Sequence, residues 1–221
     1  HWAYDQLSHQ GRMHADIMAF PAEQFYDGSL HILPKSTGFH LRQLAPLICQ
    51  PGTSVLEQQL SSKRLVFFPT TIDRQSTDRK TNRHEAKLVN TLITAFEGIY
   101  SATDAPIKSG EIGIITPYRA QIAKIRRTLV QAGRNPQEYT VDTVERYQGG
   151  ARRIIILSLC TNEANQMKSL AQTNSEAIDR KLNVAMTRAR EHLVILGCEE
   201  ILRTVPHYAG LLDFIDAVQV G

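Results

Sequence analysis

The side chains best suited to chemistry are two arginines, Arg188 and Arg190, which stand just before the apolar run 193–196. A guanidinium group is always charged and planar, and it can donate two parallel hydrogen bonds to a phosphate. Beside a parallel sheet, such an arginine can reach a nucleotide bound at the edge of the sheet. The simpler interpretation is a basic helix face that ends in a core strand.

The elements that must position these arginines follow from the hydrophobic pattern. Apolar runs at 65–68, 112–115, 139–141, 154–159 and 193–196 predict buried strands. Helices are predicted between them, and one begins at the N-cap Asn82 with Glu85 as its capping-box partner. Residues 30–62 hold several prolines and glycines and are predicted to form an irregular connection. Buried strands that alternate with helices predict an α/β fold with a mostly parallel sheet and helices on both faces.

Size and composition are those of an ordinary globular domain. The chain has 221 residues and a formal net charge of only +3, so overall charge identifies no partner. The three cysteines, Cys49, Cys160 and Cys198, fit neither a disulfide framework nor a metal-ligand pattern, which favours a cytoplasmic location, or a nuclear one in a eukaryote. The sequence begins at His1 and lacks a signal peptide and a run of about 18 apolar residues. We therefore expect a single domain, residues 1–221, that is a fragment of a longer chain and has no membrane contact.

Four segments combine arginines with other polar groups near strand and helix ends. In chain order they are Gln10-Gly11-Arg12-Met13-His14, residues 113–121 around Thr116-Pro117-Tyr118, residues 141–149 around Thr143 and Gln148, and residues 182–190. In this order they resemble the second motor domain of superfamily 1 helicases. The most similar branch holds the nonsense-mediated-decay RNA helicase, senataxin-type helicases and the Okazaki-fragment helicase-nuclease. The resemblance spans nearly the whole chain and implies a RecA-like fold of the P-loop NTPase class.

The resemblance implies that the chain supplies one side of an ATP cleft. Arg188 is then the catalytic arginine that reaches the γ-phosphate, and Arg12 makes a second phosphate contact. The implied nucleotide-binding set also includes Gln10, Gln148 and Gly149. The chain has no G-x-x-x-x-G-K-[ST] phosphate loop. The resemblance therefore places that loop and Mg²⁺ on the N-terminal RecA-like domain of the same polypeptide, with no metal site and no activity in the isolated chain.

Single-stranded DNA or RNA is the second implied partner. The residues expected to contact it are Thr116, Pro117, Tyr118 and Thr143, which follow two predicted strands at the edge where ligands of parallel sheets bind. Glu145 and Gln148 lie between this groove and the ATP cleft. We expect them to couple the two sites, for example by Glu145 orienting an arginine of the last segment. Arg190 is expected to serve the same coupling by bracing the domain through an ion pair.

Two departures from the family pattern leave alternatives open. The family has tyrosine at the position of Gly11 and glutamate at that of Ala151, and these side chains contact the base and the ribose. Their loss predicts looser nucleotide selectivity, or a degenerate domain that binds nucleic acid or a partner without motor activity. A helicase fused to a nuclease is a further alternative. In each case we expect a monomer.

Overall fold

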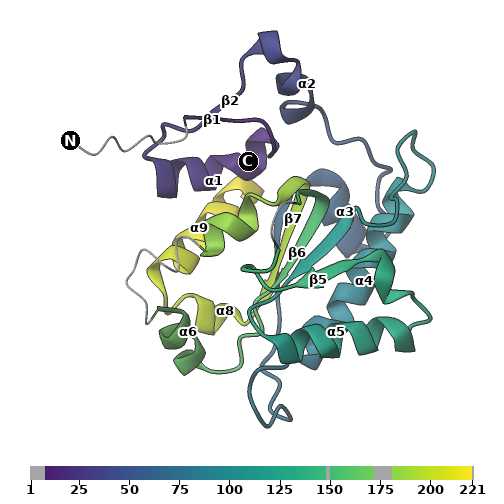
Figure 1. Ribbon diagram of the computed structural model, residues 1–221, viewed down its shortest axis with the longest axis vertical. Helices are drawn as coiled ribbons and strands as arrows, with labels where there is room; N and C mark the ends of the chain where they lie inside the picture. The colour runs from purple at the N-terminus through teal and green to yellow at the C-terminus, as the bar shows by residue number, and fades with distance from the viewer. Residues whose placement is uncertain (1–7, 148–149, 172–180, 221) are drawn as a thin grey trace.

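A five-stranded parallel sheet forms the centre of the protein (Figure 1). The computed structural model describes residues 8–147, 150–171 and 181–220. The strands are β3 (Leu65–Pro69), β4 (Ile112–Ile115), β5 (Thr140–Asp142), β6 (Arg152–Ser158) and β7 (Ala189–Gly197). Their order is β3-β7-β6-β4-β5, and all pairings are parallel. The predicted fold class is confirmed. Each predicted apolar run overlaps a strand, although Tyr139 and Leu159 lie just outside β5 and β6, and β7 begins before its run.

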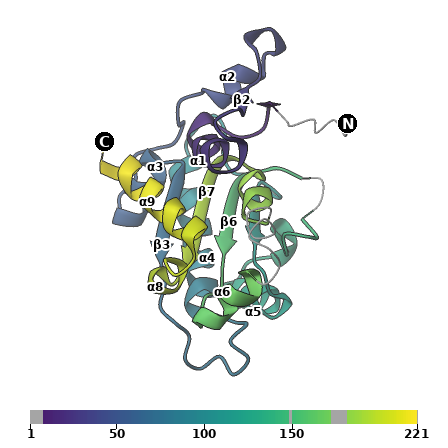
Figure 2. The same ribbon diagram turned by 90° about the vertical axis from the view of Figure 1, so that its left-hand side faces the viewer.

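Helices cover both faces of the sheet (Figures 1 and 2). Side chains alternate along each strand, so Ile155 and Leu157 face one layer while Ile154 and Ile156 face the other. The first layer holds α1 (Ala15–Tyr26), α6 (Ala164–Ala171), α8 (Glu199–Leu202), α9 (Pro206–Val220) and the helical residues 181–186. The second holds α3 (Val55–Ser62), α4 (Arg83–Tyr100) and α5 (Arg119–Gln131). Among the described residues, no helix is both long enough and apolar enough to cross a membrane.

The stretch 30–62 is more regular than its composition predicts. It contains β2 (His31–Ile32), which pairs with β1 (His9–Gln10), then η1 (Lys35–Thr37), α2 (Phe39–Gln43) and α3. A second short 3-10 helix, η2 (Pro136–Glu138), precedes β5. Helix α3 begins with a capping box, in which the side chains of Ser54 and Glu57 each accept a hydrogen bond from the other's backbone N–H. The prediction of an irregular connection was therefore wrong for α3, and the Ser-x-x-Glu spacing carried the signal.

The candidate site residues lie at opposite edges of the sheet. Because all strands run in the same direction, they begin at one edge and end at the other. Arg188 directly precedes β7, and its carbonyl accepts a hydrogen bond from the backbone N–H of Arg152 at the start of β6 (2.9 Å). Thr116 and Thr143 follow the ends of β4 and β5 at the far edge. The length of β6 separates the two edges by roughly 20 Å.

Candidate functional site

Arg12 and Arg188 meet at the amino-terminal edge of the sheet. Arg12 Nη1 donates a hydrogen bond to the carbonyl of Thr187 (3.1 Å), the residue before Arg188. Two residues after Arg12, the backbone N–H of His14 donates to the carbonyl of Arg190 (2.9 Å). The first and last predicted motifs are thus held side by side, although they stand near opposite ends of the sequence.

Neither arginine has an acidic partner within the part of the chain that the structure describes. Arg188 Nε is buried and makes no hydrogen bond with a described residue. Burial and the positive charge of Arg188 lower the pKa of Arg12 below its ordinary value. Two neighbouring cations without a counter-charge form a site that an anion stabilises, and a phosphate can accept hydrogen bonds from both.

Two glutamines hold the turn that carries Arg12. Gln10 Oε1 accepts hydrogen bonds from the backbone N–H groups of Arg12 and Met13, both at 2.8 Å. Gln43, which is fully buried, donates from Nε2 to the carbonyls of Gln10 (2.7 Å) and Met13 (3.1 Å). Gln10 therefore lies beside Arg12 and positions it, as its place in the sequence predicted. Gln43 was missed because a lone glutamine in an irregular stretch gives no sequence signal of so distant a contact.

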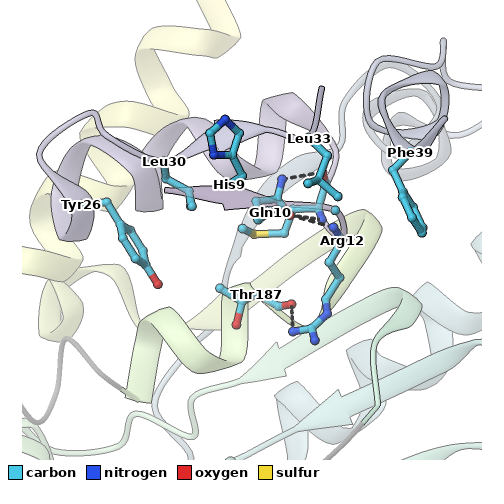
Figure 3. A pocket seen from close by; sticks show the side chains of 10 residues that line it. His9, Gln10, Arg12, Tyr26, Leu30, Leu33, Phe39 and Thr187 are labelled. Atoms are coloured by element: carbon cyan, nitrogen blue, oxygen red, sulfur yellow. Dashed lines mark hydrogen bonds between the residues drawn. The ribbon is translucent and has the colours of Figure 1, made fainter. Parts of the chain in front are cut away.

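A cavity of about 470 Å³ opens beside Arg12 (Figure 3). It is lined by His9, Gln10, Gly11, Arg12, Met13, Tyr26, Leu30, Leu33, Phe39 and Thr187. Figure 3 shows Arg12 extending from the β1–β2 pair toward Thr187, with Tyr26 on one side and Phe39 on the other. The volume is within the range of pockets that bind small molecules. The amino-terminal edge thus combines a cationic pair with a largely apolar cavity.

Arg190 does not make the predicted ion pair. Its side chain has no acidic partner among the described residues, and its Nε is buried without a hydrogen bond to any of them. Arg190 instead helps to hold the first motif through its backbone carbonyl, which accepts a hydrogen bond from the backbone N–H of His14. Among the described residues, the main chain of β7, rather than a carboxylate, holds the first motif in place.

Residues 143–147 lead from one edge of the sheet toward the other. Thr143 follows the end of β5, whereas Tyr147 is buried with its hydroxyl packed so closely on Gly113 that a side chain there would have no room. Burial raises the pKa of Tyr147 to about 12, against the opposing effect of nearby positive charges that include Arg188. The segment therefore connects the predicted strand-binding edge with the surroundings of Arg188.

Glu145 pairs with a lysine and not with an arginine of the last motif. Its carboxylate lies 2.8 Å from Lys181 Nζ, and both side chains are exposed. Among the described residues, Glu145 therefore pairs with Lys181, and no arginine of the last motif is bonded to its carboxylate. Gln148 and Gly149 lie outside the described residues, so their nucleotide contacts stay predictions.

The carboxyl-terminal edge presents fewer of the predicted strand-binding groups than expected. Thr116 is fully buried, and its hydroxyl makes no hydrogen bond with a described residue. Thr143 is also buried. This geometry argues against a hydroxyl contact between Thr116 and a strand. Pro117 and Tyr118 are half-buried and line a second cavity of about 200 Å³, so they remain accessible for such a contact.

A buried polar network fastens the loops at this edge. Gln121 Oε1 accepts a hydrogen bond from the backbone N–H of Asn82 (2.8 Å), and its Nε2 donates to Ser158 Oγ (3.2 Å). Asn162 Oδ1 accepts from Asn82 Nδ2 (3.1 Å) and from the backbone N–H of Asp73 (2.8 Å). The network ties α4, α5 and β6 to the loop that precedes α4. Asn82 caps α4 as predicted, through hydrogen bonds from two backbone N–H groups.

Glu85 is not the capping-box partner that its spacing from Asn82 predicts. It is fully buried, and its carboxylate accepts hydrogen bonds from Ser158 Oγ (2.7 Å) and the backbone N–H of Cys160 (2.9 Å). Burial raises the pKa of Glu85 from its ordinary 4.5 to about 7, although these hydrogen bonds act in the opposite direction. The end of β6 offers two donors to this carboxylate, and they replace the backbone contact that a capping box needs.

The raised pKa of Glu85 predicts a specific pH dependence of folding. Between pH 4.5 and 7 the folded protein keeps a proton that the unfolded chain releases, so stability falls as the pH rises through this window. Glu85→Gln mimics the protonated carboxyl, because its oxygen can accept from Ser158 and Cys160. As the pH rises through this window, the free energy of unfolding of the wild-type protein should fall by on the order of 2–3 kcal/mol relative to that of this variant.

Urea unfolding of both proteins at several pH values measures this difference. The exposed glutamate Glu138, replaced by glutamine, is the matched control. Equal pH slopes for the wild type and Glu85→Gln would contradict the assignment of a proton to buried Glu85.

Among the described residues, no three His, Cys, Asp or Glu side chains are grouped so that they could hold a metal ion.

The sequence is similar to that of several known proteins. A family model described as an AAA domain matches residues 1–200. The DNA-binding protein SMUBP-2 of Mesocricetus auratus is 30% identical over 221 residues, which cover 97% of this chain and 20% of that protein. The regulator of nonsense transcripts 1 homolog of Arabidopsis thaliana is 31% identical, with 94% and 15% covered. Helicase sen1 of Schizosaccharomyces pombe is 27% identical, with 94% and 11% covered.

The chain thus spans a fifth or less of the length of these relatives. The C-terminal domain of a possible Lactobacillus DNA helicase is a more distant structural match, with a TM-score of 0.38 and 14% identity over 66% of this chain and 81% of that one. The match to the AAA family covers most of the sequence, and one of these relatives is named a helicase. The chain therefore belongs to the AAA-domain family, as a superfamily 1 helicase domain of the nonsense-mediated-decay helicase branch.

Proposed function

We propose that this chain is the second motor domain of an ATP-dependent nucleic-acid helicase and supplies Arg12 and Arg188 to the γ-phosphate of ATP. The observation that carries the proposal is the convergence of these two arginines, without a counter-charge among the described residues, at one edge of the sheet. Guanidinium groups in such a place stabilise the charge that spreads over the transferring phosphoryl oxygens. Arg188 then acts on the reacting group, and Gln10 and Gln43 position Arg12.

The other half of the ATP site belongs to a preceding motor domain in this proposal. The chain has no phosphate loop, and its described residues hold no acidic cluster for Mg²⁺. ATP and its Mg²⁺ can therefore contact the cationic edge only if a second domain binds them. The length of the relatives, of which this chain matches a fifth or less, supports such an arrangement.

Single-stranded nucleic acid is proposed to bind at the carboxyl-terminal edge, near Pro117 and Tyr118. Half-buried groups at strand ends can contact a sugar-phosphate backbone without reading its sequence. Residues 143–147 are proposed to transmit strand binding to the ATP edge, because they lead from Thr143 to the surroundings of Arg188. The names of the relatives, which include a DNA-binding protein and a regulator of nonsense transcripts, fit a nucleic-acid substrate.

Separating this chain from the rest of the protein tests the proposal. The isolated chain, residues 1–221, should show no magnesium-dependent ATP turnover, because it carries the arginines but no phosphate loop. The full-length protein should hydrolyse ATP, and phosphate release measured with and without a single-stranded oligonucleotide checks both statements.

Turnover by the isolated chain at the full-length rate would overturn the half-site assignment. A full-length protein that binds single strands but never hydrolyses ATP would instead favour the degenerate binding domain. The replacement of family side chains at Gly11 and Ala151 is the observation that supports this second candidate.

A further inference from the structure

An exposed aromatic ring stands at the cationic edge of the sheet. Phe39, at the start of α2, is 47% exposed, although burial of such a ring is strongly favourable. Arg42 packs over the ring: its guanidinium carbon lies 5.4 Å from the ring centroid, and its Nη2 donates to the carbonyl of Gly11 (3.0 Å). Gln43, on the same helix, is bonded to the Arg12 turn. The ring is therefore attached to the residues that carry the phosphate-binding arginine.

Phe39 and Leu33 occupy the surroundings of the missing side chain at Gly11. A Cβ atom at Gly11 would collide with Leu33 Cδ1 and would lie 3.7 Å from Phe39 Cγ. A larger side chain at this position would have to displace Leu33. Apolar side chains from α2 and from the residue that follows β2 thus form the wall that a residue of the first motif would otherwise form.

The polar side chains of this cavity, including Arg12, already make hydrogen bonds with protein atoms. Gln10 is used by the turn, and the Tyr26 hydroxyl accepts a hydrogen bond from Asn183 Nδ2 (3.1 Å). Thr187 Oγ1 donates to the carbonyl of Val184 (2.9 Å), and His9 shares a hydrogen bond with Ser8 (3.0 Å). A flat ring that enters the cavity therefore meets mostly apolar surface, and the spare hydrogen-bonding capacity beside it belongs to hydroxyl groups such as that of Tyr26, which can bond to any base.

We propose that this cavity holds the base of the bound nucleotide, with Phe39 as its stacking face, and that it accepts purine and pyrimidine nucleoside triphosphates alike. The proposal rests on the proposed function, because Arg12 lines the same cavity and would bind the phosphate end. In Figure 3, Phe39 and Arg12 point the same way from the β1–β2 and α2 layer. Stacking holds any base, whereas discrimination between bases requires hydrogen bonds to their edges.

The test replaces Phe39 with alanine in the full-length protein. The KM for ATP should rise about tenfold with kcat little changed, since stacking is lost equally from the ground and transition states. Phe39→Trp should keep a wild-type KM. Leu41→Ala is the matched control, because Leu41 is 69% exposed on the same helix and does not line the cavity.

Substrate selectivity is measured with ATP, GTP, CTP and UTP. The wild-type kcat/KM values should lie within about tenfold of one another, and Phe39→Ala should raise every KM to a similar extent. A preference for ATP above a hundredfold, or an unchanged KM in Phe39→Ala, would overturn the inference. Equilibrium binding of a ribose-labelled fluorescent ATP analogue separates the two proposals. Loss of binding in Phe39→Ala without any turnover by the wild type would reject the motor and keep the base site.

Discussion

Replacement of Arg188 by alanine should lower ATP hydrolysis by the full-length protein by about 10³–10⁵-fold, the range found when an arginine that contacts the γ-phosphate is removed. Arg188 has no acidic partner among the described residues, so its loss leaves no buried carboxylate unpaired and should not unfold the domain. Binding of a single-stranded oligonucleotide should stay close to wild type, because the proposed strand site lies at the other edge of the sheet. Steady-state phosphate release and fluorescence anisotropy measure the two quantities.

A control variant at another arginine shows whether hydrolysis is lost because the transition-state contact is removed or merely because a positive charge is removed. Arg127 is exposed on α5, and Arg127→Ala removes the same charge far from the cationic edge. It should hydrolyse ATP at nearly the wild-type rate. If Arg188→Ala also kept a wild-type rate, Arg188 could not be the arginine that reaches the γ-phosphate.

Replacement of Gln121 by alanine should destabilise the 221-residue chain by about 3 kcal/mol. The substitution leaves the buried backbone N–H of Asn82 and the hydroxyl of Ser158 without this partner, and it opens a cavity between α4, α5 and β6. For a chain of this size, the melting temperature should fall by roughly 10 °C. Urea unfolding and thermal melting followed by circular dichroism check both values.

The control for this prediction is Gln131→Ala, at the exposed end of the same helix. It should change stability by less than about 0.5 kcal/mol. A similarly small effect of Gln121→Ala would mean that the amide is not the connection between these elements that its hydrogen bonds indicate.

Much of the fold could be predicted because it depends on local pattern. Run 112–115 has no polar side chain and run 154–159 has only Ser158, as expected of strands covered on both faces, and strands cover all of the first run and residues 154–158 of the second. The cap at Asn82 could be predicted from one residue and the pattern that follows it. The α3 capping box is equally local, although the surrounding prolines and glycines favour an irregular stretch.

The errors share a physical cause. Glu85 stands at capping distance from Asn82 in the sequence, but the end of β6 provides better donors. Glu145 was predicted to orient an arginine, whereas Lys181 is the cation that it meets. In both cases the carboxylate could bond to more than one partner, and its actual partner is a residue distant in the sequence.

The sequence by itself determined the α/β class, the parallel strands and the helicase motifs, because strand periodicity and motif spacing are properties of contiguous residues. Only the tertiary structure decided where these motifs lie. The common direction of the strands separates Arg188 from Pro117 and Tyr118 by the length of the sheet, and the contact with Thr187 brings Arg12 to the same edge as Arg188. The cavity wall of Leu33 and Phe39 likewise exists only because β2 and α2 fold back over Gly11. Such contacts depend on strand register and on the packing of loops, which no local pattern encodes.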